Sequence, residues 1–287
     1  MTVAVLGPGA VGGVLAVGFL QAGVDVICIA RPATAELISS EGLSLRQGEK
    51  VQMVRPAAVT ELDEPVELLL VTVKAPALAE ALDRLQAAPR FAVPLLNGIE
   101  HMETLRQRLP ETDVVGASIG RIEAWLERPG VVIQPTPSVV MTVAAGAPVA
   151  LLRRSGVEVR ENGTADAVLW EKLARQAATA AVTTITQRPV GELRSDPDWR
   201  QRFRQGIDEA CAVAAADGVV LSAAAEWEII EAMPPLLTSS TARDIAAGVP
   251  SELDAIAGAV VRAGRRLGVQ TPVLSQLFDE ACRASSR

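Results

Sequence analysis

The chain has 287 residues, enough for about two domains at roughly 100–200 residues each. Hydrophobic residues make up 49% of it, so a large core can form without disulfide or metal cross-links. The 27 basic and 34 acidic side chains give a net charge of −7, which argues against nucleic acid as a general partner. The cysteines Cys28, Cys211 and Cys282 lie far apart and form no CxxC pair, as is typical of proteins in the reducing cytoplasm.

The N-terminal segment predicts a strand, a helix and a second strand over residues 3–6, 10–21 and 24–30. Gly7, Gly9 and Gly12, between the first strand and the first turns of the helix, have the GxGxxG spacing of a dinucleotide-binding loop. The first makes a tight turn, the second lets the backbone approach a pyrophosphate, and the third lets helix pack closely on strand. The pyrophosphate would lie over the helix N-terminus, where N–H groups and the helix dipole favour an anion. The residues expected to bind it are Gly7, Pro8, Gly9, Ala10, Val11 and Gly12.

The residue after the second strand bears on the choice of cofactor. NAD-binding proteins carry Asp or Glu about twenty residues after the glycines, where the acid accepts hydrogen bonds from the ribose. Here Arg31 occupies that place, and no acid follows until Glu36. A guanidinium stays charged and suits the 2′-phosphate of NADP(H), so we expect NADP(H). The alternative is an ordinary solvated loop arginine.

Residues 3–24 are almost uncharged and could be mistaken for a signal peptide or a membrane span. No Lys or Arg precedes them, so the basic segment that opens a signal peptide is missing. The glycines also fall where a phosphate loop needs them. We therefore expect a cytoplasmic protein with no membrane partner.

Strands and helices alternate through the rest of the first half. The apolar run 66–73 is typical of a strand buried on both faces of a parallel sheet, and residues around Gln47-Gly48 predict a hairpin turn. This alternation predicts a Rossmann-type, doubly wound α/β sheet. The predicted strands lie at 42–45, 50–54, 66–73, 91–96, 114–119, 130–134, 139–144 and 157–160, and the predicted helices at 34–41, 77–85, 100–109 and 147–154.

After residue 165 the pattern predicts helices only, over 166–184, 199–217, 223–231, 251–267 and 272–283. We therefore expect an NADP(H)-binding domain over residues 1–163 and an all-α substrate and catalytic domain over 164–287. Ligands of open α/β sheets bind beyond the carboxyl ends of the strands. Lys74 and Asn97 each follow such a strand end, so both are expected to face a cleft between the domains. Because a metal site needs several converging ligands and His101 is the only histidine, no metal is expected.

Several short motifs, in order and at consistent spacing, resemble the ketopantoate reductase (2-dehydropantoate 2-reductase) family over essentially the whole chain. Members of that family are NADPH-dependent and reduce a 2-oxo acid to a 2-hydroxy acid. The resemblance therefore implies a small-molecule 2-oxo acid as the substrate. The matching stretches are Gly7–Gly13, Val71–Ala75, Asn97-Gly98 with Glu103 and Leu105, Trp170–Ala174, Gly191–Leu193, Thr238–Ser240 with Asp244, and Ser251–Asp254.

The resemblance implies a role for several residues of this chain. Lys172 matches the catalytic lysine, which gives a proton or a charge-assisted hydrogen bond to the ketone oxygen as hydride arrives at carbon. A useful acid needs a pKa below the free value of ~10.4, which partial burial can supply. Glu252 matches a glutamate near the nicotinamide ribose and the substrate. Lys74 and Asn97 match positions around the ribose and substrate, and Ser240 matches a serine that binds the substrate carboxylate.

The chain departs from the family pattern where the substrate would bind. One and two helical turns after the lysine, the family usually places two asparagines, and this chain has Gln176 and Ala180. We expect both side chains to face the site, with Gln176 binding the substrate. One amide then replaces two, which favours a more apolar 2-oxo acid over ketopantoate.

Three interpretations remain open from the sequence. The leading one is NADPH-dependent reduction of a 2-oxo acid, with Lys172 and Glu252 as the catalytic pair. The second keeps this chemistry on a different, more apolar keto substrate. The third is an NADP(H)-binding sensor without turnover, which would need neither Lys172 nor Glu252. Alanine-rich helices can bury a dimer face as readily as an intramolecular one, so a homodimer also remains open.

Overall fold

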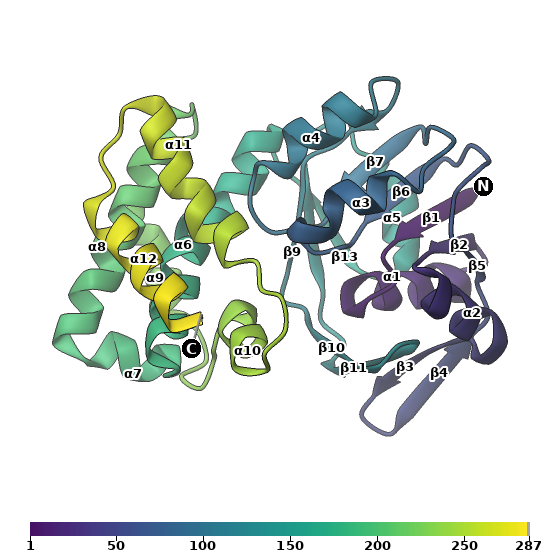
Figure 1. Ribbon diagram of the computed structural model, residues 1–287, viewed down its shortest axis with the longest axis horizontal. Helices are drawn as coiled ribbons and strands as arrows, with labels where there is room; N and C mark the ends of the chain where they lie inside the picture. The colour runs from purple at the N-terminus through teal and green to yellow at the C-terminus, as the bar shows by residue number, and fades with distance from the viewer. Residues whose placement is uncertain (286–287) are drawn as a thin grey trace. The chain divides into compact units, whose positions relative to one another are not determined.

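The computed structural model describes residues 1–285, which pack as two compact units (Figure 1). The first unit comprises Met1–Leu96 and His101–Val168, and the second comprises Asn97–Glu100 and the chain from Leu169 onward. The sequence places the domain boundary between residues 163 and 164. It does not predict that Asn97–Glu100, a loop of four residues, packs with the second unit.

The first unit is built on a six-stranded sheet in which every neighbouring pair is parallel. The strand order is β5-β2-β1-β6-β7-β8, with β1 at Thr2–Leu6, β2 at Asp25–Ile29, β5 at Ala57–Val59, β6 at Leu68–Val71, β7 at Phe91–Pro94 and β8 at Asp113–Val114. Parallel neighbours in this order need crossovers, and helices provide several of them. The predicted doubly wound α/β sheet is confirmed.

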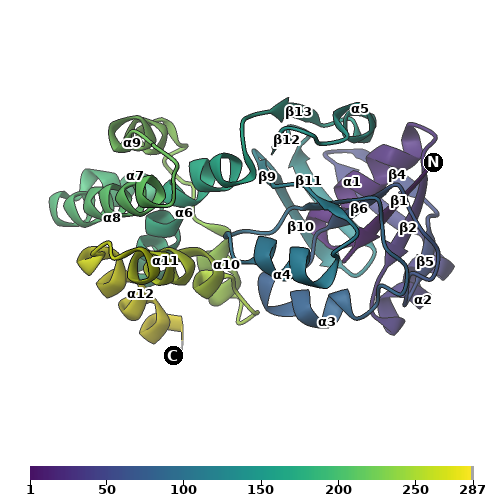
Figure 2. The same ribbon diagram turned by 90° about the horizontal axis from the view of Figure 1, so that it is seen from above.

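Helices cover both faces of this sheet, which explains why its strands are continuous apolar runs. Val3 and Val5 face a core shared with α1 (Ala10–Gln21), whereas Ala4 and Leu6 face the opposite core. Figure 2 shows α1 on one side of the sheet and α3 (Leu78–Leu82) and α4 (His101–Arg108) on the other. These four side chains of β1 are at most 1% exposed, so a polar substitution on either face would enter a core.

Two smaller sheets complete the first unit. The predicted hairpin is confirmed, since Gln47 pairs with Lys50 and Gly48 has φ +58°. The expected single strand over 114–119 is wrong, because the chain leaves one sheet and enters another at Gly116. A Cβ on Gly116 would lie 2.4 Å from the Cβ of Ala165. One sheet contains β3 (Leu43–Gln47), β4 (Lys50–Val54), β10 (Glu123–Arg128) and β11 (Val131–Thr136). The other contains β9 (Ala117–Gly120), β12 (Val140–Val143) and β13 (Glu158–Glu161), and α5 (Val149–Leu152) contacts β13. Helix α2 (Pro32–Glu41) contacts β5 of the six-stranded sheet.

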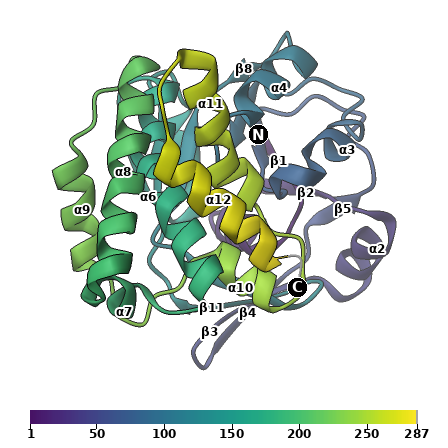
Figure 3. The same cartoon turned by 60° about the vertical axis from the view of Figure 1, so that its left-hand side comes forward.

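The second unit is helical (Figure 3), as predicted. Two short helices were not expected, and the helix predicted over 251–267 opens with a π-helical turn at Asp254–Gly258. Among residues 1–285, no helix combines the length and apolar character needed to cross a membrane. The helices are α6 (Ala165–Thr186), α7 (Val190–Ser195), α8 (Pro197–Ala216), α9 (Ala223–Ala232), α10 (Ser240–Ala246), α11 (Ala259–Leu267) and α12 (Pro272–Ser285).

Helix α6 runs through the core of this unit and carries Lys172. Its small buried side chains allow other helices to approach closely, and a Cβ on Gly206 of α8 would lie 3.2 Å from the Cβ of Ala178. A larger residue at either position would therefore push α8 away from α6. The position of Lys172 thus depends on close packing around α6.

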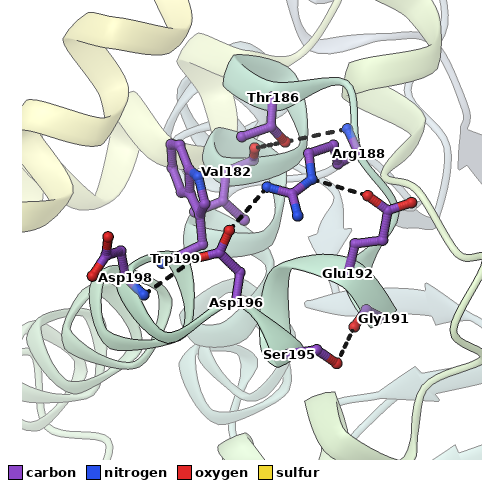
Figure 4. Close-up of polar contacts among 9 residues, drawn as sticks. All are labelled: Val182, Thr186, Arg188, Gly191, Glu192, Ser195, Asp196, Asp198 and Trp199. Carbon is purple, nitrogen blue, oxygen red and sulfur yellow. Dashed lines mark hydrogen bonds and ion pairs between the residues drawn. The ribbon is translucent and has the colours of Figure 1, made fainter.

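A polar junction anchors the C-terminal end of α6 (Figure 4). Arg188 donates to Glu192 at 2.9 Å and to Asp196 at 3.1 Å. Asp196 also caps α8 by accepting from the backbone N–H groups of Asp198 and Trp199. The hydrogen bond from Arg188, followed by that from the Trp199 N–H, lowers the pKa of Asp196. The junction therefore links the end of α6 to both α7 and α8.

Candidate functional site

The three glycines of the first unit have the geometry that a dinucleotide loop requires. Gly7 has φ +84°, a backbone angle that residues with a side chain rarely adopt. A Cβ there would lie 2.5 Å from Val73. At Gly9 the nearest atom to an added Cβ is 3.9 Å away, so the backbone is open to an approaching ligand. At Gly12 an added Cβ would lie 2.8 Å from Val5 on β1, because helix and strand pack directly together.

The N-terminus of α1 has the features of an anion-binding site. Gly9 is its N-cap, and neither a side-chain cap nor an acidic residue occupies its first turn. Its first N–H groups and the positive end of the helix dipole are therefore not used by acidic or capping side chains. Thr72, which sequence analysis did not single out, donates to the Gly7 carbonyl at 2.7 Å and supports the turn from β6. These features fit the pyrophosphate of a dinucleotide.

Arg31 and Lys74 both lie just beyond strands of the parallel sheet. Arg31 follows β2 as the N-cap of α2 and is exposed, and within residues 1–285 no carboxylate forms an ion pair with it. Lys74 follows β6, is also exposed, and precedes a short 3₁₀ turn at Ala75–Ala77. Both side chains are thus exposed near the carboxyl ends of parallel strands.

The second unit contains a hydrogen-bonded cluster centred on Asn97. Lys172 Nζ donates to Asn97 Oδ1 at 2.7 Å, and Gln176 Nε2 donates to the same oxygen at 3.0 Å. The amide nitrogen of Asn97 donates to Glu252 Oε2 at 2.7 Å. The amide oxygen of Asn97 thus accepts hydrogen bonds from two side chains of α6, and its nitrogen donates to Glu252, just before the π turn. The structure brings together four residues that the sequence assigned to the site through the family resemblance.

This environment changes the acidity of Lys172. Loss of solvation on burial lowers the pKa of its ammonium to about 8, the nearby Glu252 carboxylate opposes that change, and the Arg175 guanidinium adds to it. Arg175 is held at 2.8 Å from Glu226, a carboxylate that is only 7% exposed. A lysine with this pKa is charged at neutral pH and gives up its proton more readily than a free lysine.

The expectation that Ala180 faces the site is wrong. Its side chain is fully buried in the apolar core of the helical unit. At 3.6 residues per turn, eight residues rotate a position by about 80° from Lys172, which carries Ala180 round to the core side of α6. Gln176, only four residues on, remains half-buried beside Asn97.

Ser240 is exposed as the first residue of α10. The preceding residue, Ser239, is the N-cap of that helix and lies 2.7 Å from the hydroxyl of Thr183 on α6. Thr183 itself donates to the Thr179 carbonyl at 2.6 Å, so Ser239 is the donor of the hydroxyl pair. The hydrogen bond between Ser239 and Thr183 therefore joins the N-terminus of α10, next to Ser240, to α6.

The first unit thus has the loop geometry of a dinucleotide fold, and the second presents a lysine whose pKa suits proton transfer. That combination places the protein in the class of two-part, nicotinamide-dependent oxidoreductases. Family models agree along the chain: "Ketopantoate reductase PanE/ApbA" matches residues 3–147, and "Ketopantoate reductase PanE/ApbA C terminal" matches residues 164–282. The chain belongs to the ketopantoate reductase PanE/ApbA family.

Two relatives agree with this assignment, and a more distant structure shares the fold. The 2-dehydropantoate 2-reductase of Pyrobaculum aerophilum is 31% identical over 284 residues, covering 96% of this chain and 95% of the relative. The crystal structure of a PanE/ApbA family ketopantoate reductase from Ralstonia eutropha JMP134 has a TM-score of 0.86 at 30% identity and covers 100% and 99% of the two chains. The ternary structure of D-mandelate dehydrogenase with NADH and anilino(oxo)acetate shares the fold, with a TM-score of 0.89 at 22% identity over 100% and 99%.

The corrected position of Ala180 generates a prediction about stability. Ala180→Asn should lower the free energy of unfolding by about 1–3 kcal/mol or more, because an amide would be buried in an apolar core without hydrogen-bond partners. Gln176→Asn is the matched control and should have a smaller effect, since position 176 is half-buried. Urea unfolding of both variants measures the difference. Equal stability of Ala180→Asn and the parent would mean that the side chain at position 180 faces the site and not the core.

Proposed function

We propose that this chain catalyses the NADPH-dependent reduction of a 2-oxo acid to a 2-hydroxy acid, with Lys172 as the proton donor. The observation that carries the proposal is the hydrogen-bonded cluster of Lys172, Asn97 and Glu252, in which the lysine pKa is about 8. A sensor that bound the cofactor without turnover would have no use for such a lysine.

Residues 1–163 are proposed as the NADP(H)-binding domain. Gly7–Gly12 would hold the pyrophosphate, Arg31 the 2′-phosphate, and Lys74 the neighbouring ribose. Asn97 and Glu252 would contact the nicotinamide ribose, as the family resemblance implies. A reduced nicotinamide supplies a hydride when bound.

Residues 164–287 are proposed as the substrate and catalytic domain. The ketone oxygen would accept a hydrogen bond from Lys172 and then its proton, as the carbonyl carbon accepts hydride and becomes a carbinol. Negative charge grows on that oxygen during the reaction, so the ammonium stabilises the transition state more than the ground state. Glu252 favours the charged form of the lysine at the start, and water returns the proton after turnover. The exposed hydroxyl of Ser240 is proposed to bind the substrate carboxylate.

A second candidate function is the same reduction of a 2-oxo acid that is more apolar than ketopantoate, and positions 176 and 180 favour it. Gln176 already donates to Asn97, and Ala180 lies in the core, so neither position supplies the amide pair expected from the family. Binding of a hydroxylated acid therefore has fewer fixed donors to use. A panel of 2-oxo acids, compared by kcat/KM with NADPH, ranks the two candidates.

Replacing the proposed acid should stop turnover without preventing cofactor binding. Lys172→Ala should lower kcat by a factor of about 10² or more, the usual scale for losing a general acid. NADPH affinity should stay close to that of the parent. Lys50→Ala, on the exposed β3–β4 hairpin, is the control and should keep full activity. If Lys172→Ala keeps most of its turnover on the best substrate, the proposed mechanism fails.

Cofactor choice is tested at Arg31. NADPH should bind at least about tenfold more tightly than NADH, because a guanidinium pairs with the 2′-phosphate. Arg31→Asp should reverse that preference, whereas Arg106→Asp, an equal charge change on α4, should leave it unchanged. Fluorescence titration of the three proteins with both cofactors gives the six affinities needed. Equal affinities in the parent would remove Arg31 from the cofactor site.

A further inference from the structure

The loop Asn97–Glu100 follows β7 in sequence yet packs on the π turn of the helical unit. Gly98 has φ +88°, and a Cβ there would lie 2.2 Å from the carbonyl oxygen of Ala255. The loop backbone therefore lies directly on the turn that follows Glu252. That contact lies at Gly98, and a second contact holds the far end of the loop at Glu100.

Arg262 on α11 provides that contact. Its Nε donates to Glu100 Oε1 at 2.8 Å and its Nη2 donates to Glu100 Oε2 at 2.7 Å, a bidentate pair at the end of the loop. Its Nη1 donates to Asp254 Oδ1 at 2.7 Å, within the π turn. The hydrogen bonds that Arg262 donates to Glu100 and then to Asp254 raise the pKa of Arg262, so the guanidinium stays charged throughout the working range.

We propose that Arg262 is a positioning residue for the reductase site: by joining Glu100 to Asp254, it holds Asn97 between Lys172 and Glu252. The inference rests on the proposed function, because it gives the Asn97 cluster a role in turnover. Arg262 acts through the loop and does not contact the reacting atoms.

Charge explains why the arginine cannot simply be omitted. Glu100 and Asp254 face the same guanidinium, so without it two carboxylates would be left close together and would repel each other. The loop would then move away from the π turn at its Glu100 end. Asn97 holds Lys172 and Glu252 at 2.7 Å each, and a displacement of about 1 Å would break both hydrogen bonds. Small displacements of this kind can lower turnover strongly.

The test compares Arg262→Gln with Arg266→Gln, a matched change one turn later on α11 where the arginine pairs with Asp217. Arg262→Gln should lower kcat about tenfold and raise KM for NADPH, because Asn97 is proposed to contact both Lys172 and the nicotinamide ribose. It should also speed amine labelling of Lys172 at pH 8, because Nζ would lose its hydrogen bond to Asn97. Arg266→Gln should do none of these. Adding Glu100→Gln to Arg262→Gln should recover part of kcat, because it removes the repulsion between the two carboxylates.

Amine labelling of Lys172 separates failure of this inference from failure of the proposed function. If the parent reduces no 2-oxo acid, the proposed function fails, while labelling of Lys172 still tests the positioning role. Unchanged labelling in Arg262→Gln, or a loss of kcat equal to that in Arg266→Gln, would overturn the inference. Should Arg262→Gln not fold, Glu100→Gln alone removes the bidentate ion pair and should show the same faster labelling, with unchanged labelling again counting against it.

Discussion

The candidate site depends on one side-chain amide, that of Asn97. Its oxygen accepts from Lys172 and Gln176, and its nitrogen donates to Glu252. Only a group with an acceptor end and a donor end can satisfy a cationic donor and a carboxylate at once. A carboxylate at position 97 would face Glu252 without a donor, and an apolar residue would leave polar groups of Lys172 and Glu252 without this partner. The amide therefore sets the relation between the proposed acid and its neighbouring anion.

The supports of this amide come from three parts of the helical unit. α6 presents Lys172 and Gln176 one turn apart, and close packing against α8 fixes that helix. The π turn accommodates the loop at Gly98, and Arg262 fixes the end of the loop at Glu100. π turns occur often at functional sites, because the extra residue per turn changes which side chains face a ligand. Here the turn is the surface on which the Asn97 loop rests.

Local patterns in the sequence predict the fold well, because strand and helix periodicity and the glycine spacing are short-range signals. They miss α7 and α10, which have seven residues or fewer and too few turns to show a period. The cluster itself could be predicted only by resemblance, since Asn97 and Glu252 are 155 residues apart and no local pattern joins them. Ala180 was misplaced because spacing by whole turns ignores the rotation that accumulates over eight residues. The role of Arg31 remains a prediction from both sequence and position.

The acidity of Lys172 is the most direct test of this account. The chain has three lysines, Lys50, Lys74 and Lys172, so pH-dependent amine labelling followed by mass spectrometry can report on each one separately. Only the neutral amine reacts, and the account predicts that labelling of Lys172 reaches half of its maximum near pH 8, with exposed Lys50 as the internal reference. Half-maximal labelling of Lys172 near the free-lysine value of ~10.4 would contradict a desolvated proton donor held by Asn97.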